Sequence, residues 1–392
     1  MLKINRKNKR FTRIEINLAD FTHNIRVLRS HISSPGTRIM AVVKSNAYGH
    51  GVVEISKHAV KNGINSLGVA LAEDAMTLRK VGIKVPILIL GEPPMEIVND
   101  AIKYDFTLCI NSLEKAQAIS GKCSKYGKRA RVHIKVDTGM NRVGISFRDA
   151  VEVICNIVKL PNLDVEGLFT HFSCAGEKDQ SYTKMQWDRF QEVQSALEAK
   201  KMHFKIIHCA NSAAFLRSKV FHCNMVRLGI SLYGLSPFGS GSEDWLEQDA
   251  QKILKDLRPI LSLKSRVSFV KNVPAGQSIS YGATYTTTKP SVIATIPIGY
   301  ADGYTRLFSN KAGVLINGDI APVVGNVTMD QIMIDVTDVT DSDEIVEGTE
   351  VTLIGNAGNK KITADYLSGM IGTINYEILC MLKDKIPRIY IY

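Results

Sequence analysis

Long apolar runs and paired cysteines are both missing from this 392-residue sequence. No stretch reaches the roughly 18 apolar residues that a membrane-spanning helix needs, and no apolar segment follows the basic first residues. We therefore expect neither a membrane span nor a signal peptide. The seven cysteines are scattered and include no CxxC pair, which argues against a disulfide framework and a structural zinc site. These absences predict a cytoplasmic protein without a bound metal.

Proline is also scarce, with 12 residues, and no internal repeat or low-complexity segment occurs. With 45% hydrophobic and 22% charged residues, the composition is that of a globular protein. The length favours two domains, although an α/β barrel alone can absorb about 250 residues.

Acidic residues are fewer than basic ones, 38 against 49, which gives a net charge of +11. Such an excess can indicate nucleic acid, an anionic membrane or small acidic substrates. The basic residues are mostly dispersed, and no recognition-helix, zinc-knuckle or RNP pattern accompanies the one cluster in residues 1–13. We therefore expect a small-molecule substrate, with no nucleic acid and no membrane as partner.

Eight short, β-branched runs recur between positions 38 and 230, and most are separated by segments with helical spacing. They read RIMAVVK, SLGVA, VPILIL, FTLCI, RVHIKVD, VEGLFTHF, KIIHCA and NMVRLG. Strands that alternate with helices predict a parallel sheet, and eight such units favour a closed (β/α)8 TIM barrel over an open sheet. We assign the barrel to residues 1–255, with residues 1–17 as a tail and a strand associated with a second domain.

The second domain, residues 256–392, has a different pattern of hydrophobic residues. Alternating and β-branched runs are broken there by Gly, Asn and Asp, which predicts a mainly antiparallel β domain. Residues 236–256 combine Gly and Ser with charges and predict a linker that carries a short helix.

Lys44 stands at the end of the first apolar run, where a charged amine is costly. Most lysines at strand ends simply reach solvent, but desolvation lowers an amine pKa from about 10.4 and prepares it to form a Schiff base. Gly229 and Ile230 follow the eighth run with backbone N–H groups, and Ser212 adds a hydroxyl after the seventh. A lysine and a phosphate cradle at one barrel rim suggest pyridoxal 5'-phosphate.

Eight motifs in order carry a resemblance that covers residues 12 to 380: KSNAYGHG, KVDTGMNRVGI, FTHFSCA, HCANSAAF, VRLGISLYG, ISYGATY, GNVTMDQ and INYEILC. They resemble the motif set of the alanine racemases. The resemblance implies a fold-type III pyridoxal phosphate barrel with a β domain. It also implies a head-to-tail homodimer whose active site is shared between subunits, and a two-base interconversion of L- and D-alanine that supplies peptidoglycan.

By position in these motifs, Lys44 is similar to the lysine that binds the cofactor and acts as one base. Tyr281 is similar to the opposite base, which the partner subunit contributes. Two bases on either side of a planar carbanion can remove and return a proton without moving the substrate. Arg227 matches the arginine that faces the pyridine nitrogen. Because a guanidinium does not give up its proton fully, the carbanion is short-lived and reprotonation is favoured.

The other roles are implied by the resemblance alone. His171 links Arg227 to Tyr281, and Arg142 binds the phenolic oxygen of the cofactor and the substrate carboxylate. The backbone of Met329 contacts that carboxylate, and Asp330 has a supporting position. The remaining cofactor-binding positions are matched by Tyr48, Asn211, Ser212, Gly229, Ile230 and Tyr376.

Lys135 raises a separate hypothesis. Alternation in RVHIKVD places His133, Lys135 and Asp137 on one face of a strand. If that face lines the barrel, Lys135 repels Arg142. The family often resolves this repulsion with an N-carboxylated lysine, and we predict the same modification here.

Two features leave the substrate open. Thr328 stands where a cysteine is common in the family, so selectivity can shift. A serine or broad-specificity racemase is the alternative on the same scaffold, although the bulk of Tyr376 favours a small side chain. A non-catalytic pyridoxal phosphate carrier would lack both the β domain and Tyr281.

Overall fold

The computed structural model describes residues 10–239 and 242–392, so residues 1–9 of the predicted tail lie outside it. The chain divides into two compact units. The barrel unit comprises Thr22–Ala47 and Gly51–Arg258, and the β unit comprises the residues up to Phe21, Tyr48–His50 and Pro259–Tyr392.

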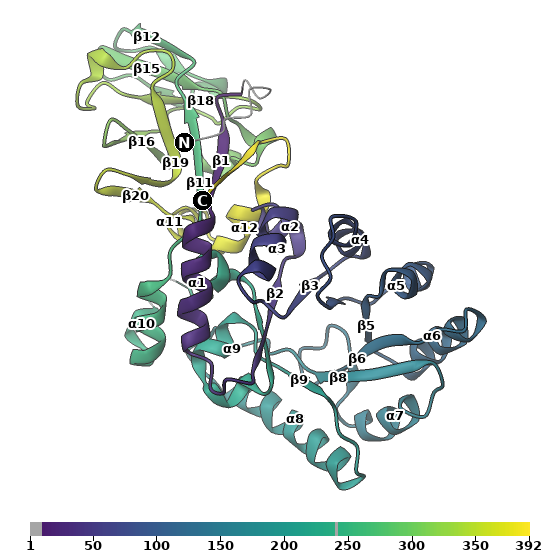
Figure 1. Ribbon diagram of the computed structural model, residues 1–392. Helices are drawn as coiled ribbons and strands as arrows, with labels where there is room; N and C mark the ends of the chain where they lie inside the picture. Colours follow the sequence, from purple (N-terminus) through teal and green to yellow (C-terminus); the bar gives the residue numbers. More distant parts are fainter. Residues whose placement is uncertain (1–9, 240–241) are drawn as a thin grey trace. The chain divides into compact units, whose positions relative to one another are not determined.

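The barrel unit contains one parallel ladder of eight strands in the order β10-β2-β3-β4-β5-β6-β8-β9 (Figure 1). Each predicted run forms one of them: β2 Arg38–Val42, β3 Ser66–Val69, β4 Ile87–Ile89, β5 Thr107–Ile110, β6 Ala130–Asp137, β8 Leu163–Phe169, β9 Ile206–His208 and β10 Met225–Leu228. A backbone bond of 3.0 Å from Arg227 N to Ala210 O connects the two ends of the ladder. The prediction of a (β/α)8 barrel followed by a β domain is therefore confirmed.

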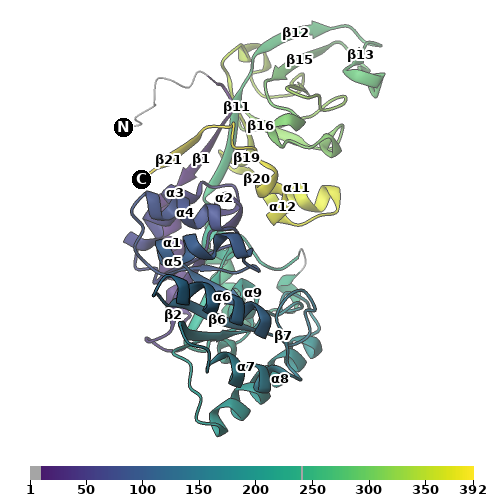
Figure 2. The same cartoon turned by 90° about the vertical axis from the view of Figure 1, so that its right-hand side faces the viewer.

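The helices of the barrel unit alternate with these strands, and α4 to α7 lie outside them in Figures 1 and 2. In α3 the buried residues Val52, Ile55, Ser56 and Ala59 follow the spacing of one helix face. Ser112 caps α6 by accepting a bond from Lys115 N. Helix α1 Leu18–Ser30 begins in the β unit and continues into the barrel unit, and the short α2 Lys44–Tyr48 follows β2. The other helices are α3 Val52–Lys61, α4 Ala72–Lys80, α5 Val98–Tyr104, α6 Leu113–Lys125, α7 Ala150–Ile157, α8 Ser181–Ala199, α9 Ser212–Arg217 and α10 Gln248–Asp256.

The β unit is built on a sheet of order β17-β16-β19-β11-β1-β21, with β20 paired to β19. Strand β1 (Arg13–Asn17), from the start of the chain, lies antiparallel to β11 and parallel to β21. The other strands of this sheet are β11 Leu261–Arg266, β16 Gly313–Ile316, β17 Asp319–Pro322, β19 Glu350–Ala357, β20 Lys360–Ile362 and β21 Arg388–Ile391. The other strand pairings among its described residues are antiparallel.

Three further strands of the β unit form a small antiparallel sheet, β12 Phe269–Val273, β15 Ser291–Ile296 and β18 Ile332–Asp335. A hairpin of β13 Ser278–Ile279 and β14 Tyr285–Thr286 follows β12, and the helices α11 Ala364–Ile371 and α12 Asn375–Met381 precede β21. Across the described ranges, no helix has both the length and the apolar character that a membrane crossing requires.

Candidate active site

The segment after Lys44 has an unusual backbone. Ser45, Asn46, Ala47 and Tyr48 all have φ between 52 and 54°. This left-handed region costs roughly 1–2 kcal/mol per non-glycine residue, so the turn needs support. The side chain of Asn46 supplies part of it by accepting a 2.8 Å bond from Val52 N. Backbone strain of this kind is characteristic of functional sites, and here it directly follows the candidate nucleophile.

Arg227 is buried inside the barrel and donates along two of its nitrogen atoms. Nη1 contacts His208 Nδ1 at 2.7 Å and His208 O at 3.1 Å. Nη2 contacts Thr170 O, His171 Nδ1 and Cys209 O at 2.9 to 3.0 Å. Among the residues that the structure describes, none accepts from the remaining donor, Nε–H. This donor is thus available to a ligand at the end of β10.

These contacts fix how the histidines carry their protons. A guanidinium only donates, so the Nδ1 atoms of His171 and His208 both accept. The two imidazoles are neutral, because burial and the charge of Arg227 hold the pKa of each well below its ordinary value. We therefore assign the proton of both rings to Nε2.

Lys135 lies in the same interior, 4% exposed, with Nζ 5.8 Å from the centroid of Phe169. Burial lowers the pKa of Lys135 to about 8, and the neighbouring charges of Arg142 and Arg227 act in the same direction. Burial likewise lowers the pKa of Arg227 to about 10. His171 is close enough to Lys44, Lys135, Arg142 and Arg227 for all four cations to depress its pKa. A group of four cations so close together is suited to an anionic ligand.

The residues predicted to bind a phosphate lie just after β9 and β10. Gly229 N donates to Ser212 Oγ at 3.0 Å, and this contact joins the two loops. Asn211 caps α9 by accepting from Ala214 N at 2.9 Å. Ile230 begins the 3-10 turn that follows Gly229. The barrel unit thus gathers Lys44, Lys135, Arg142, His171, Asn211, Ser212, Arg227, Gly229 and Ile230 at or near the carboxyl ends of its strands.

The other sequence-predicted residues belong to the β unit, and two of them meet there. The rings of Tyr48 and Tyr376 have centroids 6.0 Å apart. Burial raises the pKa of both phenols, so both stay protonated at neutral pH and can donate. Tyr48 follows the barrel strand β2 in sequence but packs with the β unit.

Tyr281 stands on an exposed turn between β13 and β14, and its side chain is 76% exposed. Asn326 holds the turn, because its Nδ2 donates to Tyr281 O at 2.7 Å and its own carbonyl accepts from Ser280 Oγ at 2.7 Å. Gly325, which precedes Asn326, has φ +75°, and a Cβ atom at this position would lie only 2.6 Å from Ile279 O. The backbone beneath Tyr281 is thus rigid while the phenol is accessible.

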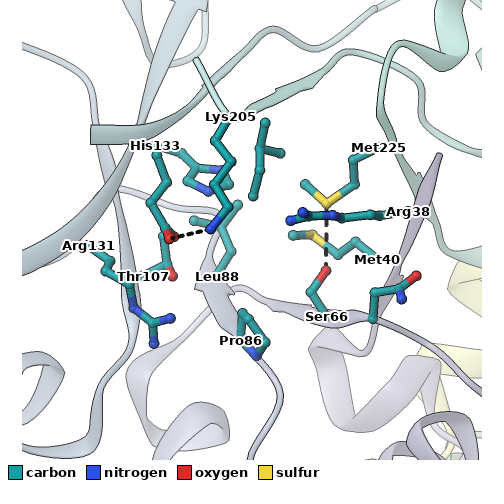
Figure 3. Close-up of a pocket in the computed structure, with 13 residues that line it drawn as sticks. Arg38, Met40, Ser66, Pro86, Leu88, Thr107, Arg131, His133, Lys205 and Met225 are labelled. Atoms are coloured by element: carbon teal, nitrogen blue, oxygen red, sulfur yellow. Dashed lines mark hydrogen bonds and ion pairs between the residues drawn. The ribbon is translucent and has the colours of Figure 1, made fainter. Parts of the chain in front are cut away.

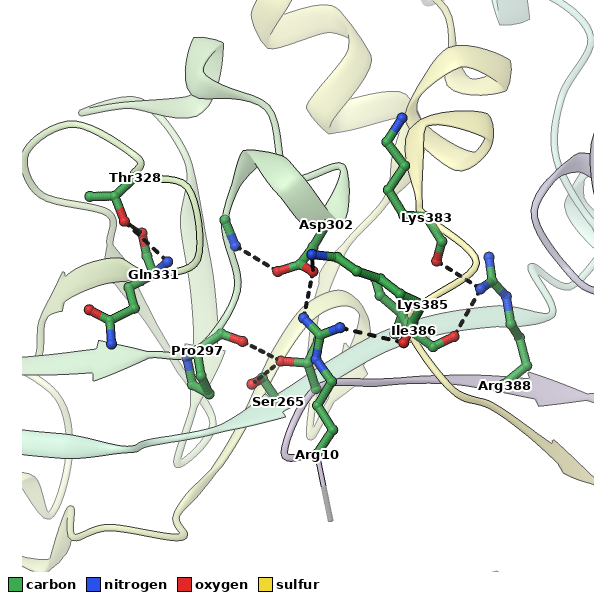
Figure 4. Close-up of polar contacts among 12 residues, drawn as sticks. Arg10, Ser265, Pro297, Asp302, Thr328, Gln331, Lys383, Lys385, Ile386 and Arg388 are labelled. Atoms are coloured by element: carbon green, nitrogen blue, oxygen red, sulfur yellow. Dashed lines mark hydrogen bonds and ion pairs between the residues drawn. The ribbon is translucent and has the colours of Figure 1, made fainter. Parts of the chain in front are cut away.

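Met329 and Asp330 lie in sequence between Thr328 and Gln331, which Figure 4 shows together with the buried carboxylate of Asp302. Asp302 is 1% exposed; it accepts from Arg10 at 2.5 Å, Lys385 at 3.0 Å and Gly299 N at 3.1 Å. The residues after Gly299 hold the loop of Met329 and Asp330 in place, because Tyr300 N donates to Thr328 O and Ala301 N donates to Met329 O. Met329 and Asp330 remain exposed.

Sequence reasoning missed two parts of this arrangement. His208 received no role, although it lies in the seventh predicted strand next to Arg227. Asp302 was missed as well, and its only signal was a carboxylate in an otherwise apolar segment.

Comparisons with known proteins agree with this geometry. The family description "Alanine racemase, N-terminal domain" matches residues 16–237, and "Alanine racemase, C-terminal domain" matches residues 260–390. The chain is 43% identical to an alanine racemase of Halothermothrix orenii, over 98% of each chain. It is also 43% identical to one of Desulfovibrio desulfuricans, over 96% of this chain and 97% of that one.

Solved structures show the same fold. An alanine racemase of Clostridium difficile 630 superposes with a TM-score of 0.89 at 39% identity, covering 98% of this chain and 97% of that one. An alanine racemase of Bacillus anthracis with bound L-Ala-P gives 0.89 at 38% identity, over 98% and 96% of the two chains. The chain therefore belongs to the alanine racemase family, and it is an isomerase that racemises alanine.

Proposed function

We propose that the chain binds pyridoxal 5'-phosphate at Lys44 and racemises alanine with Lys44 and Tyr281 as its two bases. The observation that carries the proposal is the buried Arg227 network beside Lys44. It presents an unused Nε–H donor and a cluster of cations where an anionic, nitrogen-containing ring would fit. When bound, the cofactor supplies an electron sink that makes the α-proton of an attached amino acid acidic.

The residues of this chain have different roles in the proposed reaction, according to their positions. Lys44 holds the cofactor through its amine and moves a proton on one face. Ser212 and the backbone of Gly229 and Ile230 bind the phosphate, together with Tyr48 and Tyr376. Arg142 and the backbone of Met329 bind the substrate carboxylate and so fix which face of the Cα atom each base meets.

Arg227 sets the strength of the electron sink. Its guanidinium would donate a hydrogen bond to the ring nitrogen of the cofactor and would keep its proton, because even after burial its pKa is about 10. Without a full proton on that nitrogen the cofactor would be a weaker electron sink, which would favour return of a proton to the substrate over side reactions. His171 accepts from Arg227 through Nδ1, so its Nε2–H is free to donate to the phenol of Tyr281 and to lower its basicity.

The active site requires a second copy of the chain. A base must be excluded from water to act on a carbanion, yet Tyr281 is 76% and Met329 55% exposed in a single chain. A head-to-tail homodimer in which these residues cover the barrel rim of the partner explains that exposure.

N-carboxylation of Lys135 would replace a positive charge beside Arg142 with a negative one. A buried amine with a pKa of about 8 has a substantial neutral fraction near neutral pH, and the neutral amine attacks carbon dioxide and releases one proton. The resulting anion holds Arg142 in place of repelling it. In protein equilibrated with ¹³C-bicarbonate, we expect a carbamate carbon resonance that is absent from a Lys135→Ala variant.

The proposed physiological role is supply of D-alanine for peptidoglycan in the cytoplasm. The relatives named above are alanine racemases, which favours alanine over the serine alternative. The test is to remove the cofactor with hydroxylamine and measure racemisation of L-alanine and L-serine before and after pyridoxal phosphate is added back. We expect loss and full recovery with alanine, and slower turnover of serine. Activity that persists in cofactor-free protein would refute the proposal.

A further inference from the structure

A second cavity lies at the end of the barrel opposite to Lys44. It has a volume of about 120 Å³ and is lined by residues from the amino ends of the strands, among them Arg38, Ser66, Thr107, Arg131 and Met225 (Figure 3). The active-site groups follow the carboxyl ends of the same strands. None of the sequence-predicted site residues lines this cavity.

The walls of the cavity carry more positive than negative charge. Arg38, Arg131 and Lys205 line it, and Glu166 is the one carboxylate among its lining residues. Figure 3 shows the Lys205 amine directed toward that carboxylate. The two groups are 4.0 Å apart and the lysine is 65% exposed, so this pair is weak and leaves the excess charge in place.

Arg131 holds a donor that the described part of the chain does not satisfy. Its Nη2 is bonded to Asp105, through the carboxylate and through the backbone oxygen at 3.1 Å. Its Nε atom is buried and, among the described residues, has no hydrogen-bond partner. A buried donor without a partner costs about 1–3 kcal/mol, and a bound acceptor would remove that cost.

His133 offers a second donor, and its protonation follows from the active site. Arg227 forces His208 to accept at Nδ1, so the neutral His208 carries its proton at Nε2 and donates it to His133 Nδ1 at 2.9 Å. Burial lowers the pKa of His133 to about 3, so His133 is neutral as well. Its own proton must therefore be at Nε2, for which no described residue is an acceptor.

The position of the His133 ring is fixed by the strand beside it. A register shift in the pairing of β6 with β8 brings Gly167 opposite His133. A Cβ at Gly167 would lie 2.6 Å from the ring, so only glycine leaves room for the imidazole. The ring lines the cavity wall, and its donor cannot turn away.

The rest of the lining limits what can bind. Met40, Leu88, Ile206 and Met225 form an apolar cluster within it. Sites for larger organic ligands usually measure about 300–1,000 Å³, so this volume suits a ligand of a few heavy atoms. The Nε2–H donor of His133 and the cations Arg38, Arg131 and Lys205 favour an acceptor with negative charge, against one carboxylate, Glu166, in the same wall.

We propose that this cavity is a binding site for a small oxyanion, held by Arg131 and His133 with Arg38 and Lys205 at its mouth. A short carboxylate and an inorganic anion such as sulfate share this chemistry, and the apolar cluster would contact the chain of a carboxylate. The site does not depend on the proposed cofactor or on racemisation, because its residues belong to the other end of the barrel.

The test is calorimetric titration of sulfate into the full chain saturated with pyridoxal phosphate, so that the cofactor site is filled and no small carboxylate competes for the cavity. We expect one sulfate per chain. Arg131→Gln should weaken binding about tenfold, the equivalent of one charge-assisted bond, and Arg38→Gln should weaken it less. Arg266→Gln, an exposed arginine on β11, is the matched control and should bind like the parent protein.

Crystals soaked in selenate locate the anion by its anomalous signal. A peak between Arg131 and His133 supports the proposal, and its displacement by acetate identifies a carboxylate as the better ligand, whereas its persistence favours the inorganic anion. Absence of sulfate binding, a peak elsewhere, or affinity that is unchanged in both Arg131→Gln and Arg38→Gln would overturn it. Melting curves of the variants show whether they are folded.

Discussion

The barrel unit and the β unit differ in whether their buried charged side chains have partners of opposite charge. In the barrel unit Arg227 and Lys135 are buried at 3% and 4% exposure, among neutral histidines, carbonyl groups and the face of Phe169. In the β unit the buried carboxylate of Asp302 is paired with two cations, and Glu350 is paired with Arg13 at 2.5 Å and Lys264 at 2.9 Å. The two buried carboxylates of the β unit are paired with cations, whereas Arg227 and Lys135 of the barrel unit have no ion-pair partner among the described residues.

The pKa shifts follow this division. Burial lowers the pKa of the barrel cations and histidines. Burial also acts on Asp302 and Glu350, but hydrogen bonds from their cationic partners outweigh it and lower the pKa of both carboxyls. Uncompensated buried charge is costly, so the unpaired Arg227 and Lys135 support the proposal that the barrel unit binds an anionic cofactor.

The largest effect is expected from a substitution in the barrel unit, at Lys44. Replacing it with alanine removes both the covalent anchor of the cofactor and one base. We expect racemisation to fall by more than about 10⁴-fold, since a positioned base alone contributes about 10²–10⁴-fold. Initial rates measured with a coupled D-amino acid oxidase assay check this. Lys57→Ala, on the exposed side of α3, should retain full activity.

The contribution of the β unit to catalysis is tested at Tyr281. Tyr281→Phe keeps the ring and removes the proton-carrying oxygen, so we expect racemisation to fall about 10²–10⁴-fold with the melting temperature unchanged. Tyr366→Phe, on α11 and similarly exposed, is the control. Mixing Lys44→Ala with Tyr281→Phe should restore part of the activity if the bases come from different subunits. No recovery in a mixture shown to exchange subunits would contradict the shared site.

Charge pairing in the β unit is tested at Asp302. Asp302→Asn keeps the shape and weakens the bonds from Arg10 and Lys385, so we expect a loss of about 1.5–3 kcal/mol in the free energy of unfolding, in the range for hydrogen bonds to charged groups. Urea denaturation followed by circular dichroism measures it. Asp319→Asn, whose partner Lys360 is half exposed, should cost less. An equal loss in both variants would show that burial does not set the strength of these pairs.

The smallest effect is a difference in acid sensitivity. The barrel histidines have lowered pKa values, so below about pH 6.5 the unfolded chain binds more protons than the folded one, and stability falls with pH. Asp302 and Glu350 also have lowered pKa values, but their contribution is lost only below their ordinary values of 3.8 and 4.5.

Between pH 7 and pH 5, therefore, the barrel unit should lose stability and the β unit should not. Both tryptophans, Trp187 and Trp245, belong to the barrel unit, so their fluorescence follows its unfolding in urea. Hydrogen exchange of β11 and β19 peptides, corrected for the intrinsic pH dependence, follows the β unit. Equal losses in the two units would contradict the division.

Much of this architecture could be predicted because its signals are local. Each barrel strand is a short β-branched run, and parallel strands bring their carboxyl ends to one rim. Residues as distant in sequence as His171 and Arg227 are therefore expected to meet there, and their 3.0 Å contact agrees with that expectation. Alternation likewise placed His133 and Lys135 on one face of β6.

Other features depend on contacts that no local pattern records. Of the four left-handed residues after Lys44, only Asn46 is of a type that adopts this conformation readily. Tyr48 packs with Tyr376, more than 300 residues further along the chain. The sequence also shows no reason for His208 to differ from an ordinary strand residue, because its role comes from Arg227 on another strand.

The central claim is that Lys44 of the barrel unit forms a covalent bond with the cofactor. Borohydride reduction of the protein loaded with pyridoxal phosphate, followed by proteolysis and mass mapping, tests it directly. We predict one phosphopyridoxyl label per chain, on the peptide that contains Lys44. A label on another lysine such as Lys135, or no label in a protein that racemises alanine, would contradict the account.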